Sequence, residues 1–84
     1  MKKLLLVDDD PFSLKMLEDM FRKDWRITNE TTVERILEQC KNDPPALILL
    51  NGTLRRTAGE STFLAIREQV PDIPVIAYTP ANMK

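Results

Sequence analysis

The feature that most constrains the fold is an alternation of short apolar runs with segments of helical periodicity. The runs "KLLLV" (residues 3–7), "ALILL" (46–50) and "VIAY" (75–78) indicate buried strands, and the alternating "WRITN" (25–29) indicates a strand at a sheet edge. Helical patterns lie between them, at residues 11–23, from Thr31 or Thr32 to the "NDPP" turn, and at 60–70. This β-α-β-α-β-α-β order predicts an α/β fold: one domain over residues 1–84, with a parallel sheet and helices on both faces.

Composition excludes several classes of protein. The 12 basic and 13 acidic residues give a net charge of -1 and do not run in blocks, so no electrostatic footprint for nucleic acid or an anionic membrane is present. No apolar run approaches the ~20 residues of a membrane span, and the aspartates follow the first strand too soon for a signal peptide. With no histidine and one cysteine, a disulfide framework and a histidine-based metal site are excluded, and Cys40 is interpreted as a small buried hydrophobe. We expect a soluble cytoplasmic protein.

The first helix is wider in apolar residues than its place in such a fold requires. Asp10 and Pro11 form a favourable helix start, a carboxylate N-cap followed by proline at the first helical position. The apolar side chains then cover an arc of about 200°, whereas a helix lying on one sheet needs little more than ~100°. The residues in this arc are Phe12, Leu14, Met16, Leu17, Met20 and Phe21.

Polar side chains follow two of the predicted buried strands. Asp8 and Asp9 come directly after the first strand, and Asn51 follows the third. Crowded carboxylates repel one another unless a cation lies among them, and Mg²⁺ is commonly held by one or two carboxylates. The alternative is that these aspartates only cap the helix and complement its dipole. The residues alone leave both interpretations open.

The pattern "LLLVDDDPFSLKML … PALILLNGTL … PDIPVIAYTP" resembles the receiver domain of bacterial response regulators, without gaps from residue 3 to residue 81. The resemblance implies a flavodoxin-like fold with the strands in order 2-1-3-4. It implies a metal site formed by Asp8, Asp9 and the backbone carbonyl of Thr53, and a switch hydroxyl at Thr79. The position that accepts a phosphoryl group from a histidine kinase matches Asn51.

The departures from the family pattern are as informative as the matches. An asparagine at position 51 has no anionic oxygen to attack phosphorus. Arg55 stands where the family has a proline, and the sequence stops after the fourth strand, so it lacks the family's last helices and the lysine that contacts the phosphoryl oxygens. We therefore predict a truncated, degenerate receiver that acts in two-component signalling without phosphorylation and is not an enzyme. It requires no cofactor, although Asp8 and Asp9 could still bind Mg²⁺ weakly.

Self-association is the predicted mode of action. The fourth strand carries no charge, proline or bulge to protect its edge, and the family's fifth helix would have packed beside the first. We predict a homodimer, with a histidine kinase or another receiver as alternative partners. The surface consists of Phe12, Leu14, Met16 and Met20 of the first helix and Val75, Ile76, Ala77 and Tyr78 of the fourth strand.

Two other functions stay open at this point. The chain could be a fragment or an Asp-to-Asn variant of a phospho-accepting receiver, and deamidation of Asn51, which precedes Gly52, would restore a carboxylate. The remote alternative is a Mg²⁺-dependent phosphohydrolase, because "LLNGTLRRT" resembles the nucleophile motif of haloacid dehalogenases. That motif needs aspartates where this chain has Leu49 and Asn51.

Overall fold

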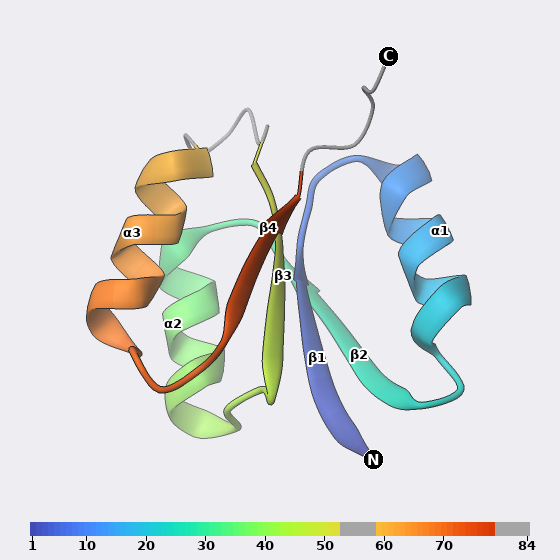
Figure 1. Cartoon of the computed structure of the whole chain (residues 1–84), viewed down its shortest axis with the longest axis horizontal. Coiled ribbons are helices and arrows are strands. Elements are labelled where there is room, and N and C mark those ends of the chain that lie inside the picture. Colours follow the sequence, from blue (N-terminus) through green and yellow to red (C-terminus); the bar gives the residue numbers. More distant parts are fainter. Residues whose placement is uncertain (53–58, 79–84) are drawn as a thin grey trace.

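The computed structural model describes residues 1–52 and 59–78, which form a four-stranded sheet with helices on both faces (Figure 1). All strand pairs are parallel and the order is β2-β1-β3-β4, which confirms the predicted α/β fold and the order 2-1-3-4. The elements are β1 (Lys2–Val7), α1 (Pro11–Phe21), β2 (Trp25–Glu30), α2 (Val33–Asn42), β3 (Leu47–Asn51), α3 (Gly59–Gln69) and β4 (Val75–Tyr78).

The beginnings of α1 and α2 are fixed by polar N-caps. The side chain of Asp10 accepts a hydrogen bond from the backbone N–H of Phe12 at 3.2 Å, and Thr32 accepts one from Arg35 at 3.3 Å, so each cap satisfies an amide that the helix leaves unpaired. Helix α1 ends at Phe21, two residues before the predicted end, because the N–H of Asp24 donates to the Phe21 carbonyl and tightens the last turn. Within the described ranges, no helix has the length and apolar character needed to cross a membrane.

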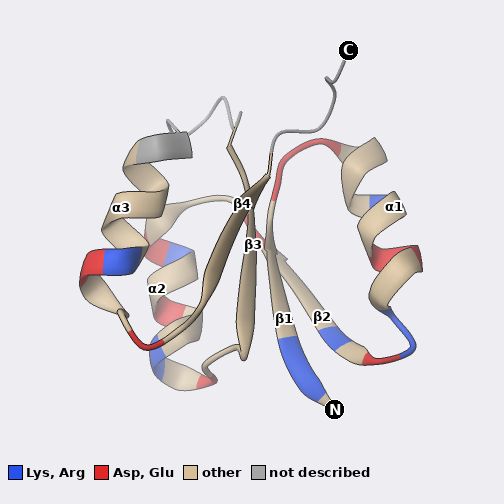
Figure 2. Cartoon of the chain, in the orientation of Figure 1, with Lys and Arg blue, Asp and Glu red and all other residues tan. Residues whose placement is uncertain are grey.

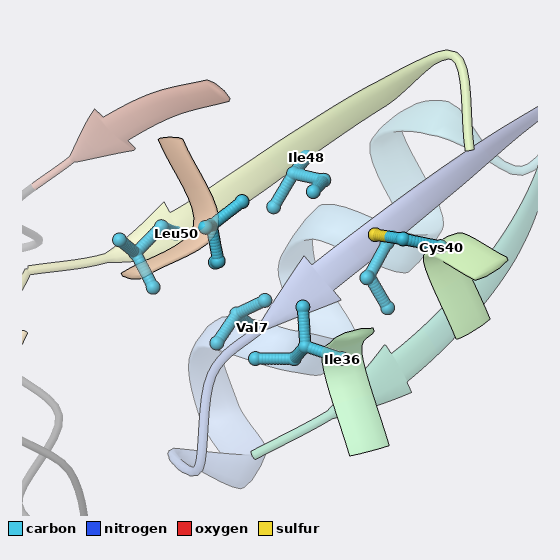
Figure 3. Packing of buried hydrophobic residues seen from close by; sticks show 7 residues of the cluster. Val7, Ile36, Cys40, Ile48 and Leu50 are labelled. Carbon is cyan, nitrogen blue, oxygen red and sulfur yellow. The ribbon is translucent and has the colours of Figure 1, made fainter. Parts of the chain in front are cut away.

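One face of the sheet is covered by α2 and α3 and holds the larger core (Figures 1 and 3). Side chains from β1 and β3 interdigitate there with side chains from both helices. Burial raises the pKa of the Cys40 thiol, in keeping with the interpretation of this residue as a packed hydrophobe. The buried members are Leu5, Val7, Ile36, Cys40, Ile48, Leu50 and Ile66.

The opposite face is covered by α1 and holds a smaller core, whose buried members are Leu4, Leu6 and Leu17. The wide apolar arc of α1 splits into two halves over this face. Leu14, Leu17 and Phe21 pack on the sheet, whereas the other half of the arc is exposed. The excess apolar width predicted from the sequence is therefore real, and it faces away from the core. The exposed residues are Phe12, Met16 and Met20.

At the amino end of β1, a buried lysine is paired with the end of α2. The Lys3 ammonium donates to the backbone carbonyl of Asp43 at 2.7 Å and lies 3.6 Å from its carboxylate. The guanidinium of Arg26, 3.2 Å from the same carboxylate, is the main cause that lowers the pKa of Asp43. Figure 2 shows basic residues at the beginning of β1 and acidic residues directly after its end.

Candidate functional site

Three polar side chains meet at the carboxyl edge of the sheet. Asp8 directly follows β1, Asn51 is the last residue of β3, and Tyr78 is the last residue of β4. The register pairs Val7 with Leu50 and Asn51 with Tyr78. Because side chains alternate between the faces of a strand, Asp8, Asn51 and Tyr78 all lie on the α1 side, at one level.

Asp8 is the centre of this group and has no exposed surface (0%). Its Oδ1 accepts from the backbone N–H of Asp10 at 2.9 Å and from the side-chain amide of Asn51 at 3.0 Å. Its Oδ2 accepts from the Tyr78 hydroxyl. A carboxylate can only accept, so the amide of Asn51 presents its nitrogen to Asp8. Both oxygens of the buried carboxylate therefore have hydrogen-bond donors.

These bonds join three strand ends through one side chain. A hydrogen bond to a charged group typically contributes about 1.5–3 kcal/mol, and a buried carboxylate without donors is strongly destabilising. Burial, the hydrogen bond to Asp8 and the negative charges of Asp8 and Asp10 raise the pKa of Tyr78, so the phenol stays protonated and remains a donor. Asp8 consequently acts as a hydrogen-bonded link between β1, β3 and β4.

The other acidic residues have different positions. Asp10 is committed to capping α1 and also accepts from the Ser13 hydroxyl at 3.0 Å. Asp9 is half-buried and lines a cavity of about 400 Å³ beside the carboxyl end of β1. The side-chain amide of Asn29 on β2 donates to the backbone carbonyls of Leu6 and Asp8. These bonds tie the end of β1 to β2, on the side of β1 that faces away from β3. The lining residues of the cavity are Asp8, Asp9, Leu14, Asn29 and Thr31.

Some predicted site residues lie outside the described residues. Thr53, proposed as a metal-binding carbonyl, Thr79, proposed as the switch hydroxyl, and Arg55 belong to this group. Their roles stay predictions. The structure brings together Asp8 and Asn51 as expected, and within the described ranges it gives Asp9 no hydrogen bond to either.

The residues predicted for self-association fall into two classes. Phe12, Met20 and Ile76 are 80%, 62% and 53% exposed, and Met16 and Ala77 are exposed as well. Leu14, Val75 and Tyr78 are half-buried and pack against the two cores. Phe12, Met16, Met20 and Ile76 lie on the α1 side of the molecule, whereas alternation along β4 places Ala77 on the side of α2 and α3. Their role in association stays a prediction.

Sequence reasoning missed the hydroxyl of Tyr78 and the amide of Asn29 as members of the site. A signal for Tyr78 was available. Tyr78 is the last residue of a predicted strand. Alternation places Asp8 on the same face as Leu4 and Leu6, and Tyr78 on the same face as Ile76. If the two strands end at the same level, Asp8 and Tyr78 share one face of the sheet. The stagger of the strands, which only the fold supplies, was the missing information.

Comparison with protein families gives a match to the response regulator receiver domain over residues 4–84. The chain belongs to this family. Receiver domains are signalling modules of two-component systems, and the resemblance carried by the sequence motifs is thereby confirmed at the level of the family. Comparison with curated proteins finds no match.

Solved structures of receiver domains share the fold. The N-terminal domain of a response regulator receiver protein from Methanoculleus marisnigri JR1 is 28% identical with a TM-score of 0.81, and the match covers 100% of this chain and 71% of that one. The receiver domain of a putative Luxo repressor protein from Vibrio parahaemolyticus is 26% identical with a TM-score of 0.69, covering 98% and 65%. The MaeR response regulator bound to beryllium trifluoride is similar in fold, at 24% identity, a TM-score of 0.80 and coverage of 98% and 70%.

Asp8, as it is arranged, does not fit Mg²⁺. Mg²⁺ requires oxygen ligands in near-octahedral geometry. Both oxygens of Asp8 instead face N–H or O–H donors, and the hydrogens of Asn51 and Tyr78 occupy lone-pair directions that a cation would otherwise use. No group of three or more acidic, cysteine or histidine side chains placed to hold a metal exists among residues 1–52 and 59–78.

The backbone around Asn51 opposes deamidation of this side chain. Deamidation before glycine needs the nitrogen of Gly52 to attack the side-chain amide, but that N–H donates to the Tyr78 carbonyl at 2.8 Å. Asn51 is also buried and hydrogen-bonded to Asp8. The folded receiver therefore protects the amide that its sequence would make labile.

Proposed function

We propose that this receiver domain acts in two-component signalling by protein–protein interaction that does not depend on phosphorylation. The observation that carries the proposal is the side chain at position 51, the position that matches the family's phosphoryl acceptor. It is an amide whose nitrogen donates to Asp8, so it offers neither a nucleophilic oxygen nor an anionic site for a metal. Phosphoryl transfer depends almost wholly on positioning and electrostatics, and this arrangement supplies neither at that position.

The interaction surface in this proposal is the exposed half of α1, made of Phe12, Met16 and Met20, together with Ile76 of β4. We call it the α1 surface. Its apolar side chains are the kind that mark protein interaction sites, and methionines adapt to irregular partners. Phe12 and Met16 also line an open groove along α1, together with Pro11, Lys15 and Asp19. In the part of the chain that the structure describes, β4 hydrogen-bonds to β3 alone, so its other edge is available for pairing.

A second copy of the chain is the proposed partner. Pairing of two β4 strands about a two-fold axis would extend the sheet antiparallel and bring the two α1 surfaces toward a shared interface. A histidine kinase or another receiver is the alternative partner. The domain acts in this proposal as a signalling module without catalysis and without a required Mg²⁺ ion, and it functions in the cytoplasm.

Two measurements test the proposal. The first treats the protein with acetyl phosphate and Mg²⁺ and follows its intact mass, using an active receiver domain as the control for the reagent. We expect no added phosphoryl group. Transfer of a phosphoryl group to the wild-type chain would overturn the phosphorylation-independent function.

The second measurement is molar mass by light scattering over a concentration series, with and without acetyl phosphate. We expect a dimer in both conditions and its loss in a Met16→Lys/Met20→Lys variant. Leu64→Lys is the matched control, because Leu64 is an equally exposed apolar residue (58%) on α3, across the sheet from the α1 surface. A monomer at all concentrations would exclude the homodimer and would leave a histidine kinase or another receiver as the partner of the α1 surface.

A further inference from the structure

A tyrosine hydroxyl lies against the buried carboxylate that follows β1. Tyr78 ends β4, pairs with Asn51 in the register and hydrogen-bonds to Oδ2 of Asp8. Oδ1 of the same carboxylate accepts from Asn51 and from the backbone of Asp10. Two of these donors come from neighbouring strand ends and one from the loop after β1, so the carboxylate is enclosed by elements far apart in sequence.

The position of the Tyr78 hydroxyl is fixed by packing. Its ring lies half-buried in the smaller core, together with Leu6, Leu49 and other side chains on the α1 face. Its hydroxyl reaches the carboxylate of Asp8, which follows β1 on the far side of β3. Moving the hydroxyl off Asp8 would pull the ring out of this core or leave a buried carboxylate oxygen without a donor, and each change costs free energy.

We infer that Tyr78 closes the acidic site of this receiver: its hydroxyl occupies Asp8 in place of a divalent cation and turns the carboxylate into a structural link between β1 and β4. The inference deepens the proposed function, on which it rests, because it gives the physical reason why the domain needs no metal. Asn51 removes the acceptor chemistry, and Tyr78 removes the metal site.

The division of roles between the two residues follows from geometry. Asn51 shares Oδ1 with a backbone N–H, so removing its amide leaves that oxygen with one donor. Oδ2 has Tyr78 as its donor, and removal of the hydroxyl uncovers this oxygen toward the strand ends. Tyr78 is therefore the residue whose hydroxyl decides whether Asp8 can accept a cation.

The test uses Mn²⁺ as the probe, with free Mn²⁺ measured by electron paramagnetic resonance in titrations of the whole chain. We expect wild type to bind Mn²⁺ at least about tenfold more weakly than Tyr78→Phe, the factor that corresponds to loss of one hydrogen bond to a charged group. Adding Asp8→Asn to Tyr78→Phe should abolish the gain. Thr28→Val is the matched control, because it removes a hydroxyl from β2 that bonds to Gln39 and does not touch Asp8.

A second variant and a second readout guard against a variant that fails to fold. Tyr78→Leu keeps an apolar side chain in the core and also lacks the hydroxyl, and thermal unfolding with and without Mn²⁺ reports binding through the shift in Tm. The inference predicts a Mn²⁺-dependent rise in Tm for the Tyr78 variants and none for wild type. Equal Mn²⁺ affinity in wild type and the Tyr78 variants would overturn it, and so would variants that fold but do not bind.

These outcomes are separable from those of the proposed function. If wild type binds Mn²⁺ tightly, the role given to Tyr78 is wrong while the amide at position 51 still prevents acceptance of a phosphoryl group. If wild type is phosphorylated by acetyl phosphate, the proposed function is wrong whatever Tyr78 does to the metal.

Discussion

The two faces of the sheet differ in how completely they are covered. On the face under α2 and α3, residues such as Leu5, Ile36 and Ile48 have no exposed surface. On the face under α1, Leu4 and Leu6 are buried, but Ile76 and half of the apolar arc of α1 meet solvent. Both faces are built from the same strands, whose successive side chains point to opposite faces. The difference teaches that the face under α2 and α3 is closed by its own helices, whereas the face under α1 leaves apolar side chains exposed.

The largest expected effect contrasts the two faces directly. Ile36→Ala, on the covered face, should lower the free energy of unfolding by about 2–5 kcal/mol because it opens a cavity in a fully packed core. Met20→Ala, on the open face, should change it by less than about 0.5 kcal/mol. Urea unfolding at low protein concentration measures both. Losses of similar size would show that the two faces do not differ in their contribution to stability.

A smaller effect is expected at the carboxyl edge, which belongs to the open face. Asn51→Asp should lower the free energy of unfolding by about 1–3 kcal/mol at neutral pH, because it replaces a donor to Asp8 with a second carboxylate. Asn42→Asp makes the same chemical change at an exposed position at the end of α2 and serves as the control. Equal stability of Asn51→Asp and wild type in urea would mean that Asp8 does not depend on the Asn51 amide.

The covered face contains one defect that offers a gain in stability. Thr62 on α3 is fully buried, and its hydroxyl has no hydrogen-bond partner within the described part of the chain. Thr62→Val should raise the free energy of unfolding by about 1 kcal/mol, because it removes a buried polar group that is not satisfied. Thr28→Val, which breaks the 3.0 Å bond to Gln39, should lower it. Thermal unfolding that ranks the two variants in the reverse order would contradict this account of the covered face.

The smallest effect appears only in alkaline solution. The fold raises the pKa of Tyr78 above the ordinary value of 10.0, chiefly through burial and then through Asp8. Above pH 10.0 the unfolded chain loses this proton while the folded chain keeps it. The contribution of Tyr78 to the free energy of unfolding is therefore fully present below that pH and is lost as the pH rises. Unfolding free energies measured between about pH 8 and about pH 11 should fall more steeply for wild type than for Tyr78→Phe. Parallel curves would mean that the phenol is not held in the protonated form by the fold. Ionisation of Cys40, whose pKa is also raised, affects both proteins alike.

Much of the fold could be predicted because it depends on local patterns. The strand at residues 75–78 was predicted with its observed bounds, and Asp10 and Thr32 cap their helices as polar residues before apolar periodicity should. Asn51 was predicted just beyond β3, yet it is the last residue of the strand. The reason is tertiary, since its pairing with Tyr78 and the Gly52 hydrogen bond to β4 extend the ladder by one residue.

By itself, the sequence determined the α/β alternation, the excess apolar width of α1 and the chemistry of position 51, since an amide lacks a nucleophilic oxygen in any fold. The tertiary structure alone decided that Asp8 is enclosed by donors instead of facing a cation. The bonds to Asn51 and Tyr78 join residues 43 and 70 positions apart, so they depend on the register and stagger of three strands. It also decided which half of the α1 arc packs and which is exposed, because a helix rotates on its sheet until the side chains that best fill the core face inward.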